Sequence, residues 1–449
     1  MQPLLQDAAE RAGAYLDGLA KRRVAFDPAA EGALDAFDTP LPDTPVDAHT
    51  VLDQLDRFGS PATTAMAGPR FFGFVIGGAL PVALAANWLA TAWDQNSALY
   101  RVTPATSRLE QVALRWLVDL FGLPHGTGGA FVTGATVANF VALAAARHRV
   151  LAQAGWNVEA DGLFDAPPID VVIGDEAHPS LVKSLGLLGL GRNRVRRVPV
   201  DGEGRLRVDA LPRIAAPAIV CTQVGNVNTG ACDAVADVRE RIGAGAWLHV
   251  DGAFGLWARA GSRVREQVRG IELADSWATD AHKWLNVPYD SGLAFVRDPV
   301  ALSAAMAITA DYLPTESAWR NPADYTPELS RRARGVDVWA ALRGLGRSGV
   351  DELVERNCRQ ARRFAEALAA HGFEVLNEVA LNQVLVAFGD AGRTRRVVDA
   401  VQAEGTCWCG GTVWQGRSAM RISVSSWATT DADVELSIEA IARVAAATR

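Results

Sequence analysis

The sequence predicts an α/β fold in which a mostly parallel central sheet is covered by helices and is followed by a smaller C-terminal α+β domain. The first observation is that apolar runs at 169–173, 217–221, 247–250 and 293–296 alternate with helical patterns. Such alternation is typical of parallel strands joined by helices. The second is that the alternation stops near residue 338. The third is size, because 449 residues, 49% of them hydrophobic, can bury a large core.

We expect three segments along the chain. Residues 1–79 form an N-terminal arm with an amphipathic helix, an acidic proline-rich stretch and a phenylalanine-rich run. Residues 80–337 form the large domain with the alternating strands and helices. Residues 338–449 form the small domain, with a helix through 360–365, strand-like runs at 383–388 and 420–425, and a closing helix. No internal repeat or long low-complexity tract is evident.

The uncharged stretch 76–93 is long enough to be compared with a membrane span. Gly77, Gly78, Pro81 and Asn87 interrupt it, and only about ten residues after Pro81 have a good helix pattern. We therefore expect a buried interface helix. The N-terminus has no basic region before an apolar block, so no signal peptide is expected.

The net charge indicates which partners are disfavoured, and the cysteine content indicates the redox environment of the protein. A net charge of −7 without a Lys/Arg-rich run disfavours nucleic acids and anionic membranes. Five scattered cysteines fit a reduced cytoplasm better than a disulfide framework. They are Cys221, Cys232, Cys358, Cys407 and Cys409. The last two form a Cys-Trp-Cys run with no second ligand pair nearby, so no metal site is expected.

The most informative residues are Lys283 and Asp251. Asp251 ends the apolar run 247–251 and precedes a turn of small residues, and a carboxylate at a strand's carboxyl end points into a ligand crevice. Lys283 lies between His282 and Trp284, in a run that is hard to place on a surface. Pyridoxal phosphate enzymes need a lysine amine and a carboxylate that keeps the pyridine nitrogen protonated. The pair therefore predicts a pyridoxal phosphate site.

The sequence also contains a candidate binding site for the phosphate of that cofactor. Gly134, Ala135 and Thr136 lead into an alanine-rich helical run. Helix N-termini bind phosphate through free backbone N–H groups and the helix dipole. The small residues would let the anion approach, and the Thr136 hydroxyl would donate a further hydrogen bond. The alternative is an ordinary N-cap.

His178 lies in a polar turn after the apolar run 169–173. Its imidazole could stack on the pyridine ring or act in proton transfer near neutral pH. The alternative is a histidine in a surface turn.

Together these motifs resemble the group II pyridoxal-dependent decarboxylases, a family that includes aromatic L-amino-acid, histidine, glutamate and diaminobutyrate decarboxylases. The motifs occur in the order and approximate spacing of that family, and the resemblance extends from Gly68 to about Ser423. It implies the fold type I, pyridoxal-phosphate-dependent transferase-like fold, an obligate homodimer and a role in amino-acid metabolism. The implied reaction is decarboxylation of an L-amino acid to the amine and carbon dioxide.

The resemblance also implies a role for each matching residue. Lys283 would hold the cofactor as an internal aldimine, Asp251 would pair with the pyridine nitrogen, and His178 would stack on the ring. Ala253 would pack beneath the opposite face. The phosphate would be held by Gly134, Ala135, Thr136 and His282.

Tyr312 resembles the tyrosine of a mobile loop that protonates the substrate carbon after carbon dioxide leaves. It is our candidate general acid, and the alternative is a tyrosine packed in a loop. Such a closing loop would also exclude water from the reaction.

Three departures from the family pattern indicate a divergent branch. Asp280 stands where many relatives carry asparagine near the phosphate, and a second anion there would repel it unless water or a cation intervened. The run 225–228 replaces a threonine-rich loop, and Asn226 could supply the polar contact instead. Asp337 falls where relatives often have lysine.

The substrate side chain is predicted from the segment that lines the cavity in relatives. We expect Phe72, Phe74 and Tyr100 to contact the substrate, which favours an aromatic or bulky apolar side chain. The alternative is that these residues are plain core, and Arg101 could equally serve an acidic substrate.

Two other functions remain open. The first is another fold type I reaction, such as carbon–carbon or carbon–sulfur lysis or an aldehyde-forming oxidative decarboxylation. Arg421 favours this alternative, because an arginine of the small domain often binds the α-carboxylate of the substrate in fold type I enzymes, and a decarboxylase must release that carboxylate. The second is a catalytically silent cofactor-binding protein, which intact Lys283, Asp251 and His178 disfavour.

Overall fold

The computed structural model describes residues 1–308 and 319–448. Contacts divide the chain into two compact units, which we call the terminal unit and the large unit. The terminal unit comprises residues 1–76, 363–376 and 385–449, and the large unit comprises residues 77–362 and 377–384. The expected segments 1–79, 80–337 and 338–449 remain a prediction about domain organisation.

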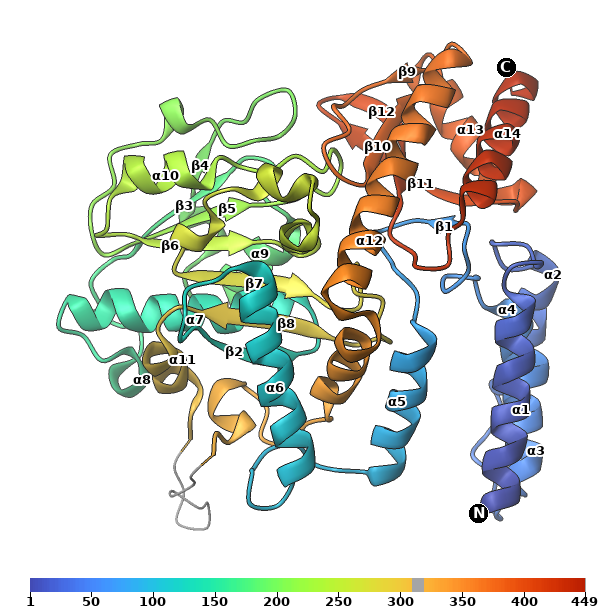
Figure 1. The fold of residues 1–449 in the computed structure, drawn as a ribbon, viewed down its shortest axis with the longest axis horizontal. Helices are drawn as coiled ribbons and strands as arrows, with labels where there is room; N and C mark the ends of the chain where they lie inside the picture. The colour runs from blue at the N-terminus through green and yellow to red at the C-terminus, as the bar shows by residue number, and fades with distance from the viewer. Residues whose placement is uncertain (309–318, 449) are drawn as a thin grey trace. The chain divides into compact units, whose positions relative to one another are not determined.

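A seven-stranded sheet forms the centre of the large unit, in the order β2-β8-β7-β6-β5-β3-β4 (Figure 1). Strands β4, β3, β5, β6 and β7 run parallel to one another, whereas β8 runs antiparallel to β7 and β2. The predicted mostly parallel sheet is therefore confirmed. The strands are β2 (Gly128–Val132), β3 (Asp170–Gly174), β4 (Arg196–Val198), β5 (Ala218–Gln223), β6 (Trp247–Asp251), β7 (Ser276–Asp280) and β8 (Gly292–Val296).

Helix α7 packs along one face of this sheet and contacts β5, β6, β7 and β8 (Figure 1). Its alanines allow this close approach, since residues 141–146 are all buried. The α-helices of the large unit are α5 (Pro81–Trp93), α6 (Pro104–Phe121), α7 (Ala135–Gln153), α8 (Val158–Asp161), α9 (Pro179–Leu187), α10 (Val235–Ile242) and α11 (Pro299–Met306).

Helix α12 (Arg334–Ala370) begins in the large unit and ends in the terminal unit, with a break at Gly346, where φ is 61°. Short helices complete the connections. They are η1 (Gly32–Phe37), η2 (Leu55–Gly59), η3 (Arg192–Arg194), η4 (Val208–Ala210), η5 (Gly255–Ala260), η6 (Val264–Val268), η7 (Ile271–Leu273) and η8 (Pro322–Tyr325). Within the described ranges, no helix is both long and apolar enough to cross a membrane.

The terminal unit joins the two ends of the chain. Its sheet has the order β1-β11-β12-β10-β9, and Phe71 of β1 pairs with Trp408 of β11. The N-terminal arm therefore adds a strand to the C-terminal sheet. Its strands are β1 (Phe71–Phe72), β9 (Glu374–Val375), β11 (Trp408–Trp414) and β12 (Arg417–Ser423), together with β10 (Gln383–Ala387), whose first two residues belong to the large unit. Its α-helices are α1 (Gln2–Gly18), α2 (Pro28–Glu31), α3 (Ala48–Gln54), α4 (Ser60–Ala62), α13 (Ala391–Glu404) and α14 (Asp431–Ala447).

Candidate active site

Asp251 lies at the carboxyl end of β6, level with the ends of its two parallel neighbours. Its backbone pairs with Gln223 on β5 and with Ala278 on β7. The carboxylate is buried and accepts hydrogen bonds from Asn139 Nδ2 (3.1 Å) and from the Ala253 N–H (3.2 Å). Burial raises the pKa of Asp251, and the charges of His178 and Lys283 oppose that rise. The structure thus brings Asp251, His178 and Lys283 together.

Lys283 lies three residues after the end of β7 and is held by its own turn. Its Nζ is 3.0 Å from Asp280 Oδ2, and its side chain is 19% exposed. Gly77 packs against the same turn, since a Cβ there would lie only 2.0 Å from the Lys283 carbonyl oxygen. Only glycine fits this position. This role of Gly77 was not predicted from the sequence, in which the Gly77-Gly78 pair was the available signal.

His178 caps the N-terminus of α9. Its ring Nδ1 accepts a hydrogen bond from the Ser180 backbone N–H (3.2 Å), and the backbone N–H of His178 donates to Gln223 Oε1 (3.1 Å). Because Nδ1 acts as an acceptor, the proton of the neutral ring lies on Nε2. The imidazole is therefore fixed by backbone and side-chain contacts at the end of β3.

The N-terminus of α7 begins at Ala135 with Gly134 as its N-cap. Gly134 is in close contact with β8, because a Cβ on Gly292 would lie 2.4 Å from the Gly134 Cα. The Ala135 N–H donates to Asp280 Oδ1 (2.6 Å), and the Thr136 carbonyl accepts from Ser184 Oγ (2.8 Å). Asp280 therefore accepts a hydrogen bond from the first N–H group of the helix that was expected to bind the phosphate.

His282 lies beside that helix end. It is 8% exposed and stacks on Tyr289 with ring centroids 4.2 Å apart. Its Nδ1 accepts from the Ser291 N–H (3.0 Å), and burial lowers the pKa of His282, so the ring is neutral. Burial raises the pKa of Tyr289 to about 12, so that hydroxyl keeps its proton. Like Gly77, Tyr289 is a residue next to the candidate site that was not predicted from the sequence.

Asn226 and Ala253 complete the loops around Asp251. Asn226 Oδ1 accepts from the Asn228 N–H (2.8 Å) and the Thr229 N–H (3.3 Å). Its Nδ2 is buried and has no hydrogen-bond partner in the part of the chain that the structure describes. The Ala253 carbonyl accepts from the Asp280 N–H (2.8 Å), which ties the ends of β6 and β7 together.

This set of groups fits pyridoxal phosphate. It combines the Lys283 amine, the buried Asp251 carboxylate, on which the charge of that amine opposes the rise in pKa caused by burial, and the N-terminus of α7. It also contains the Asn226 Nδ2 donor, which has no hydrogen-bond partner among the described residues. Among residues 1–308 and 319–448, no group of His, Cys, Asp and Glu side chains could hold a metal ion.

Four predicted residues are not placed in this site. Tyr312 lies outside the described residues. Phe72 and Phe74 belong to the terminal unit, where Phe72 packs against Phe364 (centroids 5.1 Å apart) and Phe74 against Trp408 (5.4 Å). Tyr100 belongs to the large unit and stacks on Trp319 (5.6 Å). Their substrate and proton-transfer roles stay predictions.

Comparison with curated proteins identifies relatives over most of the chain. Tryptophan decarboxylase 1 of Oryza sativa subsp. japonica is 28% identical over 82% of this chain and 78% of its own length. Phenylacetaldehyde synthase of Arabidopsis thaliana is 25% identical, with coverages of 88% and 85%. L-2,4-diaminobutyrate decarboxylase of Rhizobium meliloti (strain 1021) is 28% identical, with coverages of 82% and 74%.

Solved structures and a family model agree with these relatives. The crystal structure of Oryza sativa TDC with PLP and tryptamine has a TM-score of 0.91 at 22% identity, covering 99% of this chain and 97% of that chain. Mouse CSAD has a TM-score of 0.87 at 22% identity, with coverages of 99% and 98%. These similarities confirm the predicted fold. The model of the pyridoxal-dependent decarboxylase conserved domain matches residues 31–389. The chain therefore belongs to the pyridoxal-dependent decarboxylase family, and it is a carboxy-lyase that uses pyridoxal 5'-phosphate.

Proposed function

We propose that this enzyme converts an L-amino acid with an aromatic or bulky apolar side chain to the amine and carbon dioxide. The observation that carries the proposal is the pairing of Lys283 and Asp251 at adjacent strand ends beside the N-terminus of α7. Two relatives named for aromatic substrates, tryptophan decarboxylase 1 and the aromatic-L-amino-acid decarboxylase of Bacillus atrophaeus, support the aromatic preference. The stacked pair Tyr100–Trp319 in the large unit supports it as well.

Each polar group would have one task. Lys283 would hold the cofactor covalently, and its amine would be released when the amino group of the substrate replaces it. Asp251 would hold a proton on the pyridine nitrogen, and the N-terminus of α7 at Gly134, Ala135 and Thr136 would bind the phosphate. When bound, the cofactor supplies a ring that accepts the electrons left at the substrate Cα as carbon dioxide departs.

The remaining side chains would shape and protonate the site. His178 and Ala253 would cover the two faces of the ring, and the unpartnered Asn226 Nδ2 would donate to a polar cofactor atom. His282 would donate from Nε2 near the phosphate. Tyr312 would deliver a proton to Cα. The reaction takes up one proton per turnover, because a carboxylate leaves as neutral carbon dioxide and a C–H bond replaces the C–C bond.

The attachment of the cofactor can be tested without measuring turnover. The chain has three lysines, and the other two, Lys21 and Lys183, are exposed. Borohydride reduction of the loaded protein should fix the cofactor to the peptide that contains Lys283, as read by mass spectrometry. Lys283→Ala should abolish this label and Lys183→Ala should leave it unchanged. A label on another lysine would refute the assignment.

The reaction is tested by incubating the enzyme with a pool of L-amino acids and identifying the products by mass spectrometry. An amine lighter than one pool member by the mass of carbon dioxide would establish decarboxylation and name the substrate. Release of an amine from glutamate or 2,4-diaminobutyrate alone would refute the aromatic preference.

A second candidate is an aldehyde-forming oxidative decarboxylation, which the similarity to phenylacetaldehyde synthase favours. One oxygen molecule and one water molecule would then be consumed per amino acid, and the products would be an aldehyde, ammonia, hydrogen peroxide and carbon dioxide. Measuring peroxide together with the amine separates the two reactions. Tyr312→Phe should lower the yield of amine and raise that of aldehyde. An unchanged ratio would show that another group protonates Cα.

We also propose that the enzyme is a cytoplasmic homodimer. Helix α5 exposes Val82, Trp88, Leu89 and Trp93, with side chains 44–57% exposed, and only its Ala83 is buried in the single chain. Such an apolar surface is typical of a subunit interface. Light scattering after size-exclusion chromatography tests the oligomeric state, and a monomer at micromolar concentration would refute the proposed dimer.

A further inference from the structure

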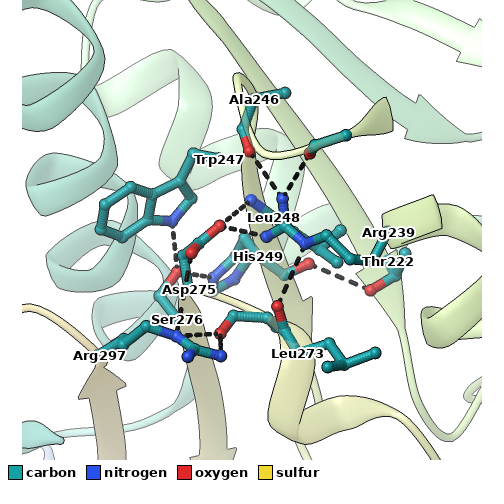
Figure 2. Close-up of polar contacts among 12 residues, drawn as sticks. Thr222, Arg239, Ala246, Trp247, Leu248, His249, Leu273, Asp275, Ser276 and Arg297 are labelled. Atoms are coloured by element: carbon teal, nitrogen blue, oxygen red, sulfur yellow. Dashed lines mark hydrogen bonds and ion pairs between the residues drawn. The ribbon is translucent and has the colours of Figure 1, made fainter. Parts of the chain in front are cut away.

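A chain of buried polar side chains leads from Asp251 away from the site. Asn139 Nδ2 donates to Asp251 Oδ2 (3.1 Å), and Asn139 Oδ1 is 2.9 Å from His249 Nε2. On the other side of the ring, His249 Nδ1 is 2.8 Å from Ser276 Oγ, which also accepts from Trp247 Nε1 (2.8 Å). Figure 2 shows Trp247, His249 and Ser276 converging between β6 and β7. Asn139, His249 and Ser276 are 0% exposed.

The hydrogen atoms of this chain can be arranged in two directions. In the first, Ser276 Oγ–H donates to His249 Nδ1, His249 Nε2–H donates to Asn139 Oδ1, and the Asn139 amide donates to Asp251. Asp251 is then an ionised acceptor. In the second, a protonated Asp251 donates to a reversed Asn139 amide, which donates to His249 Nε2, and His249 Nδ1–H donates to Ser276. The tautomer of His249 therefore reports the direction.

Trp247 favours the first direction. An indole N–H can only donate, so Ser276 Oγ always accepts from it. In the first direction the Ser276 hydroxyl hydrogen has His249 Nδ1 as its acceptor. In the second, Ser276 accepts twice, and its hydrogen has no acceptor among the described residues. Leaving a buried donor unpaired disfavours that arrangement by roughly ten- to a hundred-fold.

We propose that Trp247, Ser276, His249 and Asn139 are positioning residues that keep Asp251 an ionised hydrogen-bond acceptor. The inference rests on the proposed role of Asp251 at the pyridine nitrogen, where a protonated carboxyl could not hold a proton on the ring. The chain of donors opposes the effect of burial, which raises the pKa of Asp251. Burial also lowers the pKa of His249 to about 3, so this ring stays neutral and keeps its single proton.

The charged and titratable groups that face Asp251 are few. Lys283 follows β7, His178 follows β3, and Cys221 lies on β5. Burial raises the pKa of the Cys221 thiol, so it carries no charge at neutral pH. The direction of the hydrogen-bond chain is therefore set by Trp247 and Ser276 together with the cationic side chain of Lys283.

The first test uses cofactor-free protein and does not depend on catalysis. Histidine-labelled protein is examined by nitrogen NMR, and the His249 signal is assigned by its absence in His249→Gln. We expect the proton on Nε2 only. Trp247→Phe removes the bias, so the Nδ1-protonated form should appear. Trp277→Phe is the matched control. It deletes a comparable buried hydrogen bond, from the Trp277 indole N–H to the Ile271 carbonyl (2.8 Å), that is not part of the hydrogen-bond chain leading to Asp251.

The second test is a titration of the same proteins with pyridoxal 5'-phosphate, followed by fluorescence. Trp247→Phe should weaken binding about ten-fold at neutral pH, and more at lower pH, because protonated Asp251 becomes more populated. Trp277→Phe should bind like the wild type. An Nδ1 proton in the wild type, or equal behaviour of the two tryptophan variants, would overturn the proposal. If the NMR result holds but Asp251→Asn does not affect binding, the proposed cofactor role of Asp251 fails instead.

Discussion

Replacing Asp280 with asparagine should tighten binding of the cofactor. The Asp280 side chain is 3% exposed, and its Oδ2 lies 3.0 Å from Lys283 Nζ. Its Oδ1 accepts from the Ala135 N–H at 2.6 Å, at the helix end proposed to seat the phosphate. Two anions would therefore share one helix N-terminus, and Asp280 would lose its cationic partner when Lys283 engages the cofactor.

The magnitude follows from this geometry. Two unit charges about 4 Å apart repel by about 4 kcal/mol at an effective dielectric constant of about 20. The helix N-terminus and His282 offset part of this repulsion, and asparagine keeps an oxygen that can accept from Ala135. We therefore expect Asp280→Asn to improve binding by about 1–3 kcal/mol, which is roughly a five- to 150-fold lower dissociation constant.

The assay is a fluorescence titration of cofactor-free wild type and variant with two ligands. Pyridoxal 5'-phosphate carries the phosphate, and pyridoxal, the matched control, lacks it. Asp280→Asn should tighten the first and leave the second unchanged. If the variant binds pyridoxal 5'-phosphate more weakly, Asp280 does not repel the phosphate, and the repulsion argument is refuted. If both ligands tighten equally, the effect arises at Lys283, and the repulsion argument is again refuted.

Three further predictions concern stability and reactivity. Burial raises the pKa of Asp337 from 3.8 to about 6, so the free energy of unfolding should fall as pH rises through that range. Asp337→Asn should therefore raise the melting temperature at about pH 8 more than at about pH 5, whereas Asp94→Asn, on an exposed residue, should not. Glu110 and Arg331 form a buried ion pair of 2.8 Å with side chains 2% and 0% exposed. Glu110→Gln should cost about 3–5 kcal/mol and lower the melting temperature by several degrees, and Glu110→Leu combined with Arg331→Met should cost less. A greater loss in the double variant would contradict this account. All five cysteines are free and buried, so a thiol reagent should label none rapidly in the native enzyme and all after denaturation; rapid native labelling would show that a buried thiol is accessible.

The central elements of the fold followed from local pattern. The runs at 169–173, 217–221, 247–250 and 293–296 correspond to β3, β5, β6 and β8, because strands buried on both faces are continuously apolar. The sequence patterns did not identify β1, β2, β4, β7, β9 or β11. In β2 and β11 paired glycines weaken the strand pattern, and β7 ends in polar residues that serve the site. Local composition does not reveal such strands, because their neighbours in the sheet stabilise them.

The site was predictable where chemistry and position coincide in a short segment. Asp251 ends an apolar strand, and Lys283 lies between His282 and Trp284 in a run that is hard to place on a surface, so both were predicted from local sequence. The charge effect of Lys283 on Asp251 agrees with that pairing. Gly77 and Asn139 were missed. Each acts through a contact with a residue more than a hundred positions away, as the bond from Asn139 to Asp251 shows.

By itself, the sequence determined the class of fold and the family, and it predicted the candidate site, because strand periodicity and the residues around Lys283 are local properties. Only the tertiary structure decided which groups meet. It placed Asp280 on the N-terminus of α7, joined β1 to β11, and aligned Trp247, Ser276, His249 and Asn139 behind Asp251. The physical reason is that hydrogen-bond direction and electrostatic repulsion depend on distances between segments remote in sequence, and packing of the sheet and helices sets those distances.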